Sequence, residues 1–104
     1  MRALVIDDSS AIRKVMGRIL GDLGVETSQA VDGQDALENL DVQSRYDVVF
    51  VDWNMPRMNG IEFIRSVRSR DQFKRLPIIM VTTENEIEKV QTALEAGADE
   101  FLMK

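Results

Sequence analysis

The chain of 104 residues contains no cysteine and no histidine. Their absence excludes disulfides, thiol nucleophiles, imidazole bases and the usual ligands of structural zinc. A bound metal ion would therefore have to be a hard cation that prefers oxygen ligands.

Long hydrophobic runs are also absent, and no segment approaches the length that spans a membrane. Arg2 is followed at once by a short strand-like run, so the start of the sequence has no signal-peptide pattern. The net charge of −5 argues against DNA or anionic membranes as direct partners. We expect a cytoplasmic protein that binds neither nucleic acid nor membranes.

What is present is one regular alternation of short apolar runs and amphipathic segments. Five strands are expected, at residues 1–6, 25–31, 48–51, 78–81 and 101–103. Helices are expected from the Ser9 and Ser10 caps to Gly24, through Ala36 to Leu40, from Ile61 to Val67, and from Ile87 to near Gly97. This order predicts an α/β fold, a single domain over residues 1–104 with a doubly wound parallel sheet and helices on both faces. We expect Ile12, Val15, Ile19 and Leu23 to belong to the core.

Polar side chains follow four of these strands directly. Asp7 and Asp8 come after the first strand, Asp52 after the third, Thr82 after the fourth and Lys104 after the fifth. Parallel strands end at one edge of the sheet, where open α/β sheets place their sites. We therefore expect three carboxylates, a hydroxyl and an ammonium to share one pocket.

The charges of this pocket indicate a metal ion. Two carboxylates about 4 Å apart repel each other by on the order of 4 kcal/mol at an effective dielectric constant near 20. Lys104 supplies one positive charge, and Mg²⁺ suits the remainder because it binds through carboxylates, keeps waters and accepts phosphate oxygens. An aspartate beside Mg²⁺ can act as a nucleophile in phosphoryl transfer, and Asp52 is the best candidate because its strand is expected to be central.

These residues, with the strings DWNMPRMNG from Asp52 and MVTTE from Met80, resemble the receiver domain of two-component response regulators. The resemblance covers the whole chain and is nearest to the single-domain chemotaxis type. It implies a flavodoxin-like sheet of strand order 2-1-3-4-5. It also implies that Asp52 accepts a phosphoryl group from a phosphohistidine on a histidine kinase or a histidine phosphotransfer protein.

The resemblance assigns the metal ligands and the residues that bind the phosphoryl group. Asp7, Asp8, Asp52 and the backbone carbonyl of Asn54 would hold Mg²⁺. Lys104 and the Thr82 hydroxyl would bind phosphoryl oxygens.

Three further positions would control the phosphorylated state. Phe101 matches the aromatic switch position, while Asn54 and Glu84 match positions that tune hydrolysis of the acyl phosphate. The protein would be a signalling switch with an unknown output protein, and its only chemistry would be its own phosphorylation and dephosphorylation.

Receivers usually continue after the lysine with a fifth helix, whereas this sequence ends at Lys104. We expect a fold with four helices in which one half of Ile78 to Val81, together with Leu102, is left bare. An exposed apolar face of that size is an aggregation hazard, so we expect a homodimer that covers it.

Other interpretations stay open. Taken singly, Asp7 and Asp8 could be acids at a helix start, Asp52 a turn residue and Thr82 a helix cap. An aspartate-nucleophile phosphohydrolase usually has a second acid two residues after the nucleophile, where this chain has Asn54 after Asp52. A flavin-binding relative would need a less acidic first loop. A structural dimerisation module could keep the pocket without using it.

Overall fold

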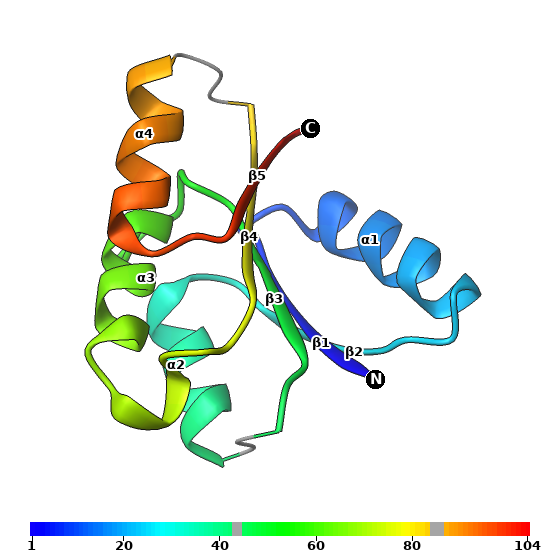
Figure 1. The fold of residues 1–104 in the computed structure, drawn as a ribbon. Helices are drawn as coiled ribbons and strands as arrows, with labels where there is room; N and C mark the ends of the chain where they lie inside the picture. The colour runs from blue at the N-terminus through cyan, green and yellow to red at the C-terminus, as the bar shows by residue number, and fades with distance from the viewer. Residues whose placement is uncertain (43–44, 84–86) are drawn as a thin grey trace.

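The computed structural model describes residues 1–42, 45–83 and 87–104. Strands and helices alternate along the chain, as expected from the sequence (Figure 1). The elements are β1 (Arg2–Ile6), α1 (Ser10–Asp22), β2 (Glu26–Ala30), α2 (Gly33–Val42), β3 (Val48–Val51), α3 (Gly60–Arg68), the 3₁₀ turn η1 (Asp71–Phe73), β4 (Ile78–Thr82), α4 (Ile87–Ala96) and β5 (Glu100–Met103).

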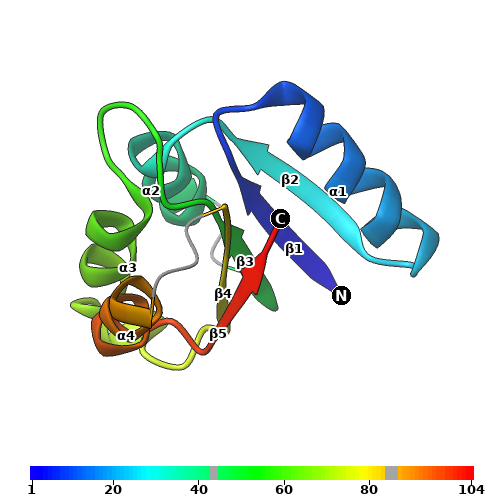
Figure 2. The same ribbon diagram turned by 90° about the horizontal axis from the view of Figure 1, so that it is seen from above.

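The five strands form one parallel sheet in the order β2-β1-β3-β4-β5, which confirms the predicted topology. Seen from above, α1 lies on one face of the sheet, and α2, α3 and α4 lie together on the other (Figure 2). Within the described residues, none of the helices is both long and apolar enough to cross a bilayer.

Local capping explains where two helices begin. The Ser9 hydroxyl accepts the backbone N–H of Ile12 and starts α1, as the sequence suggested. Asn59 starts α3 with a capping box, in which its side chain accepts the N–H of Glu62 and the Glu62 carboxylate accepts the N–H of Asn59. Short apolar runs placed the strands well, but η1 was not predicted because a single turn carries no periodicity.

The core lies between the sheet and the three helices α2, α3 and α4. Ile78 and Met80 of β4 are fully buried on this side and pack with Phe63, Ile64 and other residues of the cluster. Their neighbours Ile79 and Val81 point to the opposite face and are only partly buried. The structure thus identifies which half of β4 is less covered.

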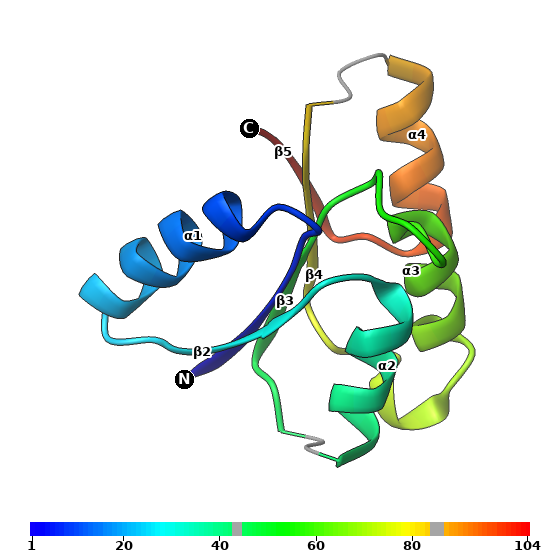
Figure 3. The same ribbon diagram turned by 180° about the vertical axis from the view of Figure 1, so that it is seen from behind.

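The opposite face shows that one prediction was wrong. Val15, Ile19 and Leu23 of α1 are 54%, 55% and 73% exposed, and Ile12 is only half-buried. The reason is that α1 stands alone on its face, so only one side of its apolar stripe meets the sheet (Figure 3). A groove of about 340 Å³ lies beside it, lined by Ile12, Val15, Met16, Ile19, Phe50, Val81, Leu102, Met103 and Lys104.

Candidate functional site

The sheet's own hydrogen bonds hold the backbone of the strand-end residues. The N–H of Asp7 donates to the carbonyl of Ala30 at 3.1 Å, and the N–H of Asp52 donates to the carbonyl of Ile6 at 3.0 Å. The N–H of Lys104 donates to the carbonyl of Thr82 at 3.0 Å. The hydrogen bonds of the sheet therefore continue into the site and fix the backbone of these residues.

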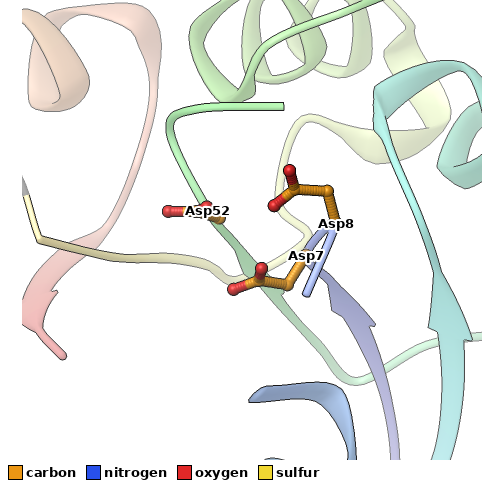
Figure 4. Close-up of side chains that lie close together, drawn as sticks. All are labelled: Asp7, Asp8 and Asp52. Atoms are coloured by element: carbon orange, nitrogen blue, oxygen red, sulfur yellow. The ribbon is translucent and has the colours of Figure 1, made fainter. Parts of the chain in front are cut away.

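Asp7, Asp8 and Asp52 converge at the carboxyl ends of β1 and β3 (Figure 4). One oxygen from each of the three carboxylates lies within 4.8 Å of the others. Asp7 and Asp52 are buried, while Asp8 is exposed at the mouth of the cluster. The sequence prediction that these three carboxylates meet is confirmed.

Lys104 bridges the two buried carboxylates. Its Nζ lies 2.8 Å from Oδ2 of Asp7 and 3.3 Å from Oδ2 of Asp52. The other oxygen of each carboxylate accepts a backbone N–H, from Ser9 at 2.9 Å for Asp7 and from Trp53 at 2.8 Å for Asp52. Both buried carboxylates thus keep one oxygen on the backbone and turn the other toward Lys104.

The charges in the cluster remain unbalanced, since three carboxylates face one ammonium. Burial, and next the charge of Asp7, raise the pKa of Asp52 above its ordinary value, although Lys104 opposes them. Burial alone would lower the pKa of Lys104, but Asp7 and Asp52 outweigh it and raise that pKa. A divalent cation would neutralise the two excess negative charges, and carboxylate oxygens are the donors that Mg²⁺ prefers. The donor set therefore fits Mg²⁺.

The other predicted site residues lie around this cluster. Thr82 is fully buried at the end of β4, and Asn54 is exposed in the loop after Asp52. Phe101 pairs in register with Met80 and is half-buried against the core. Glu84 lies outside the described residues.

The loop from Trp53 to Asn59 begins at the site and is held closely against it. The N–H of Gly60 donates to the carbonyl of Trp53 at 2.9 Å. A Cβ atom at position 60 would collide with the backbone carbonyl oxygen of Asp52, so only glycine permits this approach. The first residue of α3 therefore touches the backbone of Asp52.

Sequence reasoning missed several residues near the site. Trp53 is 9% exposed, and the Nζ atom of Lys89 lies 4.8 Å from the centroid of its ring. Asp32 is buried and paired with Arg57. No local sequence pattern predicts these contacts, because the two partners of each contact are far apart in sequence.

Comparisons with known proteins agree with this geometry. The family model described as "Response regulator receiver domain" matches residues 3–104. Chemotaxis protein CheY1 of Helicobacter pylori is 44% identical over 105 residues, which cover 100% of this chain and 85% of the relative. Chemotaxis protein CheY of Pseudomonas aeruginosa is 38% identical over 105 residues, again covering 100% of this chain and 84% of the relative.

Solved structures show the same similarity. The structure of chemotaxis protein CheY4 of Vibrio cholerae, crystallised at low pH, aligns with a TM-score of 0.93 at 42% identity. The alignment covers 99% of this chain and 85% of that chain.

Proposed function

The chain belongs to the response regulator receiver domain family, and from that premise we propose that it is the phosphoacceptor of a two-component phosphorelay. Asp52 receives a phosphoryl group from a phosphohistidine, and its phosphorylation changes a protein-interaction surface. The observation that carries the proposal is the convergence of Asp7, Asp8, Asp52 and Lys104 at one edge of the sheet.

Asp52 is the acceptor because it is the carboxylate best placed for the reaction. It ends the central strand β3, and its Oδ1 is held by the N–H of Trp53 while Oδ2 faces Lys104. In the transfer, a carboxylate oxygen of Asp52 forms a bond to phosphorus as the phosphorus–nitrogen bond of the phosphohistidine breaks. The electron pair of that bond stays on the imidazole nitrogen of the donor.

Mg²⁺ is the proposed cofactor, held by Asp7, Asp8, Asp52 and the backbone carbonyl of Asn54. When bound, it would neutralise excess negative charge and orient phosphoryl oxygens. Lys104 already lies between Asp7 and Asp52, so its ammonium can turn from the Asp52 carboxylate to a phosphoryl oxygen without leaving the pocket. The Thr82 hydroxyl binds a second phosphoryl oxygen.

The response begins with added charge. A phosphoryl group brings about −1.5 to −2 charges and strong acceptor oxygens to Asp52. Thr82 moves toward them, Phe101 takes up the space that opens, and the surface around α4 changes. Asn54 and Glu84 set how fast water removes the phosphoryl group.

The partners follow from the same proposal. A histidine kinase or histidine phosphotransfer protein supplies the phosphoryl group, and an output protein reads the changed surface. Because two relatives are named chemotaxis proteins, we propose signalling of the chemotaxis type in the cytoplasm. The protein is a switch whose chemistry is limited to its own aspartate.

The homodimer expected from the sequence stays a prediction. It is supported by the exposed apolar residues Val15, Ile19, Leu102 and Met103 around the groove beside α1. Sedimentation velocity at increasing concentration should show a dimer, and Ile19→Glu should abolish it. A folded wild type that stays monomeric at every concentration would dismiss this prediction.

Intact mass after incubation with Mg²⁺ and a small-molecule acyl phosphate tests the phosphoacceptor proposal. The wild type should gain one phosphoryl group, while Asp52→Asn and a metal-free sample should gain none. Folded wild type that gains nothing would contradict the proposal and favour a structural module with the receiver fold. Turnover of a generic phosphomonoester would instead favour a phosphohydrolase.

A further inference from the structure

Arg57 has an unusual backbone conformation in the loop that joins β3 to α3. Its φ is 65°, and it is the only residue other than glycine with a positive φ in the part of the chain that the structure describes. This region is unfavourable for a residue with a Cβ atom, and it persists only where the surroundings hold it. Something must therefore hold Arg57 in place.

An ion pair with Asp32, buried only on the side of the carboxylate, does so. Nε of Arg57 donates to Oδ2 of Asp32 at 2.7 Å, and Nη2 lies 2.6 Å from the same oxygen. The Asp32 side chain is 2% exposed, whereas that of Arg57 is 64% exposed. The other oxygen, Oδ1, accepts the N–H of Asp35 at 2.8 Å in the first turn of α2. The Asp32 carboxylate thus joins the middle of the β3–α3 loop to the start of α2.

The charge state of Asp32 agrees with this role. Burial on its own would raise the pKa of Asp32, but the hydrogen bond from Asp35 and the Arg57 guanidinium outweigh it and hold the pKa below its ordinary value. The carboxylate is therefore charged at neutral pH, and a buried charge is costly without its partner.

Backbone contacts beside the pair continue the attachment. The N–H of Gly33 donates to the carbonyl of Met58 at 3.2 Å. A Cβ atom on Gly33 would lie 2.7 Å from Cγ of Met58, so the turn and the loop are in close contact. At its ends the loop is attached to the site itself, through Asp52 and through the bond from Gly60 to Trp53.

Asn54 lies between these two attachments. The loop is held at Trp53, through the bond from Gly60, and again at Arg57 and Met58, so the path of the three residues between Trp53 and Arg57 is restricted at both ends. The direction of the Asn54 carbonyl depends on that path. Removing the attachment at Arg57 would change that path without altering any carboxylate of the metal site.

We propose that Arg57 is a positioning residue which, through its ion pair with Asp32, holds the β3–α3 loop so that the backbone carbonyl of Asn54 faces the Mg²⁺ site. This inference rests on the proposed function, because it concerns the metal site of that function. The ion pair of Arg57 is with Asp32, which is neither a proposed metal ligand nor the acceptor. Arg57 therefore acts through the loop.

The direct test is a Mg²⁺ titration of wild type and Arg57→Ala, followed by the emission of Trp53, the single tryptophan of the chain and the neighbour of Asp52. Arg57→Ala should raise the dissociation constant for Mg²⁺ roughly 10-fold, as loss of a residue that orients a ligand does elsewhere. Arg65→Ala, which removes an exposed arginine of α3, should leave it unchanged and so control for net charge. Equal constants for Arg57→Ala and wild type would overturn the inference.

Two further substitutions separate the ion pair from the backbone conformation. Arg57→Gly tolerates a positive φ and so keeps the fold, yet it should still bind Mg²⁺ several-fold more weakly than wild type because the guanidinium is gone. Arg57→Lys keeps the charge and should recover part of the affinity. A wild-type constant for Arg57→Gly would show that the ion pair is not needed and would overturn the inference.

A double substitution tests whether Arg57 acts through Asp32. Asp32→Asn keeps an oxygen for the N–H of Asp35 and removes the charge that Arg57 meets. The double variant Arg57→Ala with Asp32→Asn should bind Mg²⁺ no more weakly than the weaker single variant. Losses that multiply would mean two independent effects and would overturn the inference.

Failure of the inference and failure of the proposed function give different results. Wild type that binds Mg²⁺ and loses it on Asp8→Asn establishes the site, and an unchanged Arg57→Ala then overturns the positioning role alone. Wild type that binds no Mg²⁺ overturns both.

Discussion

The two ends of the sheet carry two charged clusters built on opposite principles. At the carboxyl ends of β1, β3 and β5, three carboxylates share one ammonium and leave negative charge unbalanced. At the amino ends of β4 and β5, the Arg68 guanidinium is matched by its surroundings. The first cluster has capacity for a cation, whereas the second has no such capacity.

The cluster around Arg68 is matched because hydrogen-bond acceptors surround its guanidinium. Its Nε donates to the carbonyl of Gly97 at 3.0 Å, and Nη1 donates to the carbonyls of Phe73 and Lys74 at 2.8 Å and 3.2 Å. Its Nη2 lies 3.0 Å from Oδ2 of Asp99, which also accepts the N–H of Ile78 at 2.8 Å. One side chain thus joins α3, the end of α4 and the starts of β4 and β5.

The comparison shows that the balance of charge decides whether a cluster in this fold serves binding or stability. A cluster whose donors and acceptors are matched contributes stability and has nothing left to bind. A cluster held together against repulsion is stabilised by a ligand of opposite charge. Removing an excess carboxylate from the first cluster should therefore raise the stability, removing Arg68 from the second should lower it, and only the first cluster should respond to Mg²⁺.

Arg68→Ala should produce the largest loss of stability. It leaves three carbonyls and the Asp99 carboxylate without their donor, and we expect the free energy of unfolding to fall by about 3 kcal/mol. Urea unfolding followed by circular dichroism measures this change. Lys74→Ala, which removes an exposed ion pair with Asp71, should cost about 0.5 kcal/mol or less. Equal effects of the two substitutions would contradict the role of Arg68.

Lys104→Gln should produce a smaller loss of about 2 kcal/mol in metal-free protein, because it removes the ammonium between two buried carboxylates. Saturating Mg²⁺ should recover much of this loss, since the cation replaces the missing positive charge. The same Mg²⁺ concentration should leave the stability difference between Arg68→Ala and wild type unchanged, because it stabilises both proteins equally. Urea unfolding of both variants with and without Mg²⁺ makes the comparison, and recovery in neither would count against a cation site.

Asp52→Asn should raise the free energy of unfolding of metal-free protein at pH 7, by less than Lys104→Gln lowers it. The raised pKa of Asp52, caused by burial and then by Asp7, means that the folded state binds the proton more tightly than the unfolded state does. Protonated Asp52 therefore stabilises the fold below its unfolded pKa, and this contribution is lost as the pH rises through its folded pKa. A destabilised Asp52→Asn would contradict the unbalanced charge.

Asp32→Asn should have the opposite dependence on pH, and it should lower the free energy of unfolding at neutral pH with the smallest effect of the four. Burial opposes but does not prevent a lowered pKa at Asp32, because Asp35 and Arg57 bind the charged form. Its contribution is present above its unfolded pKa and is lost as the pH falls through the lowered folded pKa. Unfolding curves of wild type and Asp32→Asn from pH 7 to pH 3 should converge toward acid pH.

The apolar runs of the sequence placed the strands, and the resemblance to the receiver family implied their order. Parallel pairing of these strands then predicted that Asp7, Asp52, Thr82 and Lys104 meet at one edge. The matched cluster was not predicted, because Arg68 and Asp99 are 31 residues apart and neither follows a periodic pattern. The pair of Arg57 and Asp32, 25 residues apart, was missed on the same ground.

The exposure of α1 could not be predicted for a different reason. Helical spacing identifies an apolar stripe at Val15, Ile19 and Leu23, but it does not say how much of that stripe meets another element. In the structure the stripe is wider than its contact with the sheet, and those three residues stay exposed.

The most direct measurement of the central claim is the stability of the metal-free protein as Mg²⁺ is added, for wild type, Asp52→Asn and Arg68→Ala. The account predicts that wild type and Arg68→Ala gain equal stability, about 2.7 kcal/mol at a Mg²⁺ concentration 100 times the dissociation constant. It predicts a much smaller gain for Asp52→Asn. No gain in wild type, or an equal gain in Asp52→Asn, would contradict the claim that the carboxyl end of the sheet keeps unbalanced charge for a cation.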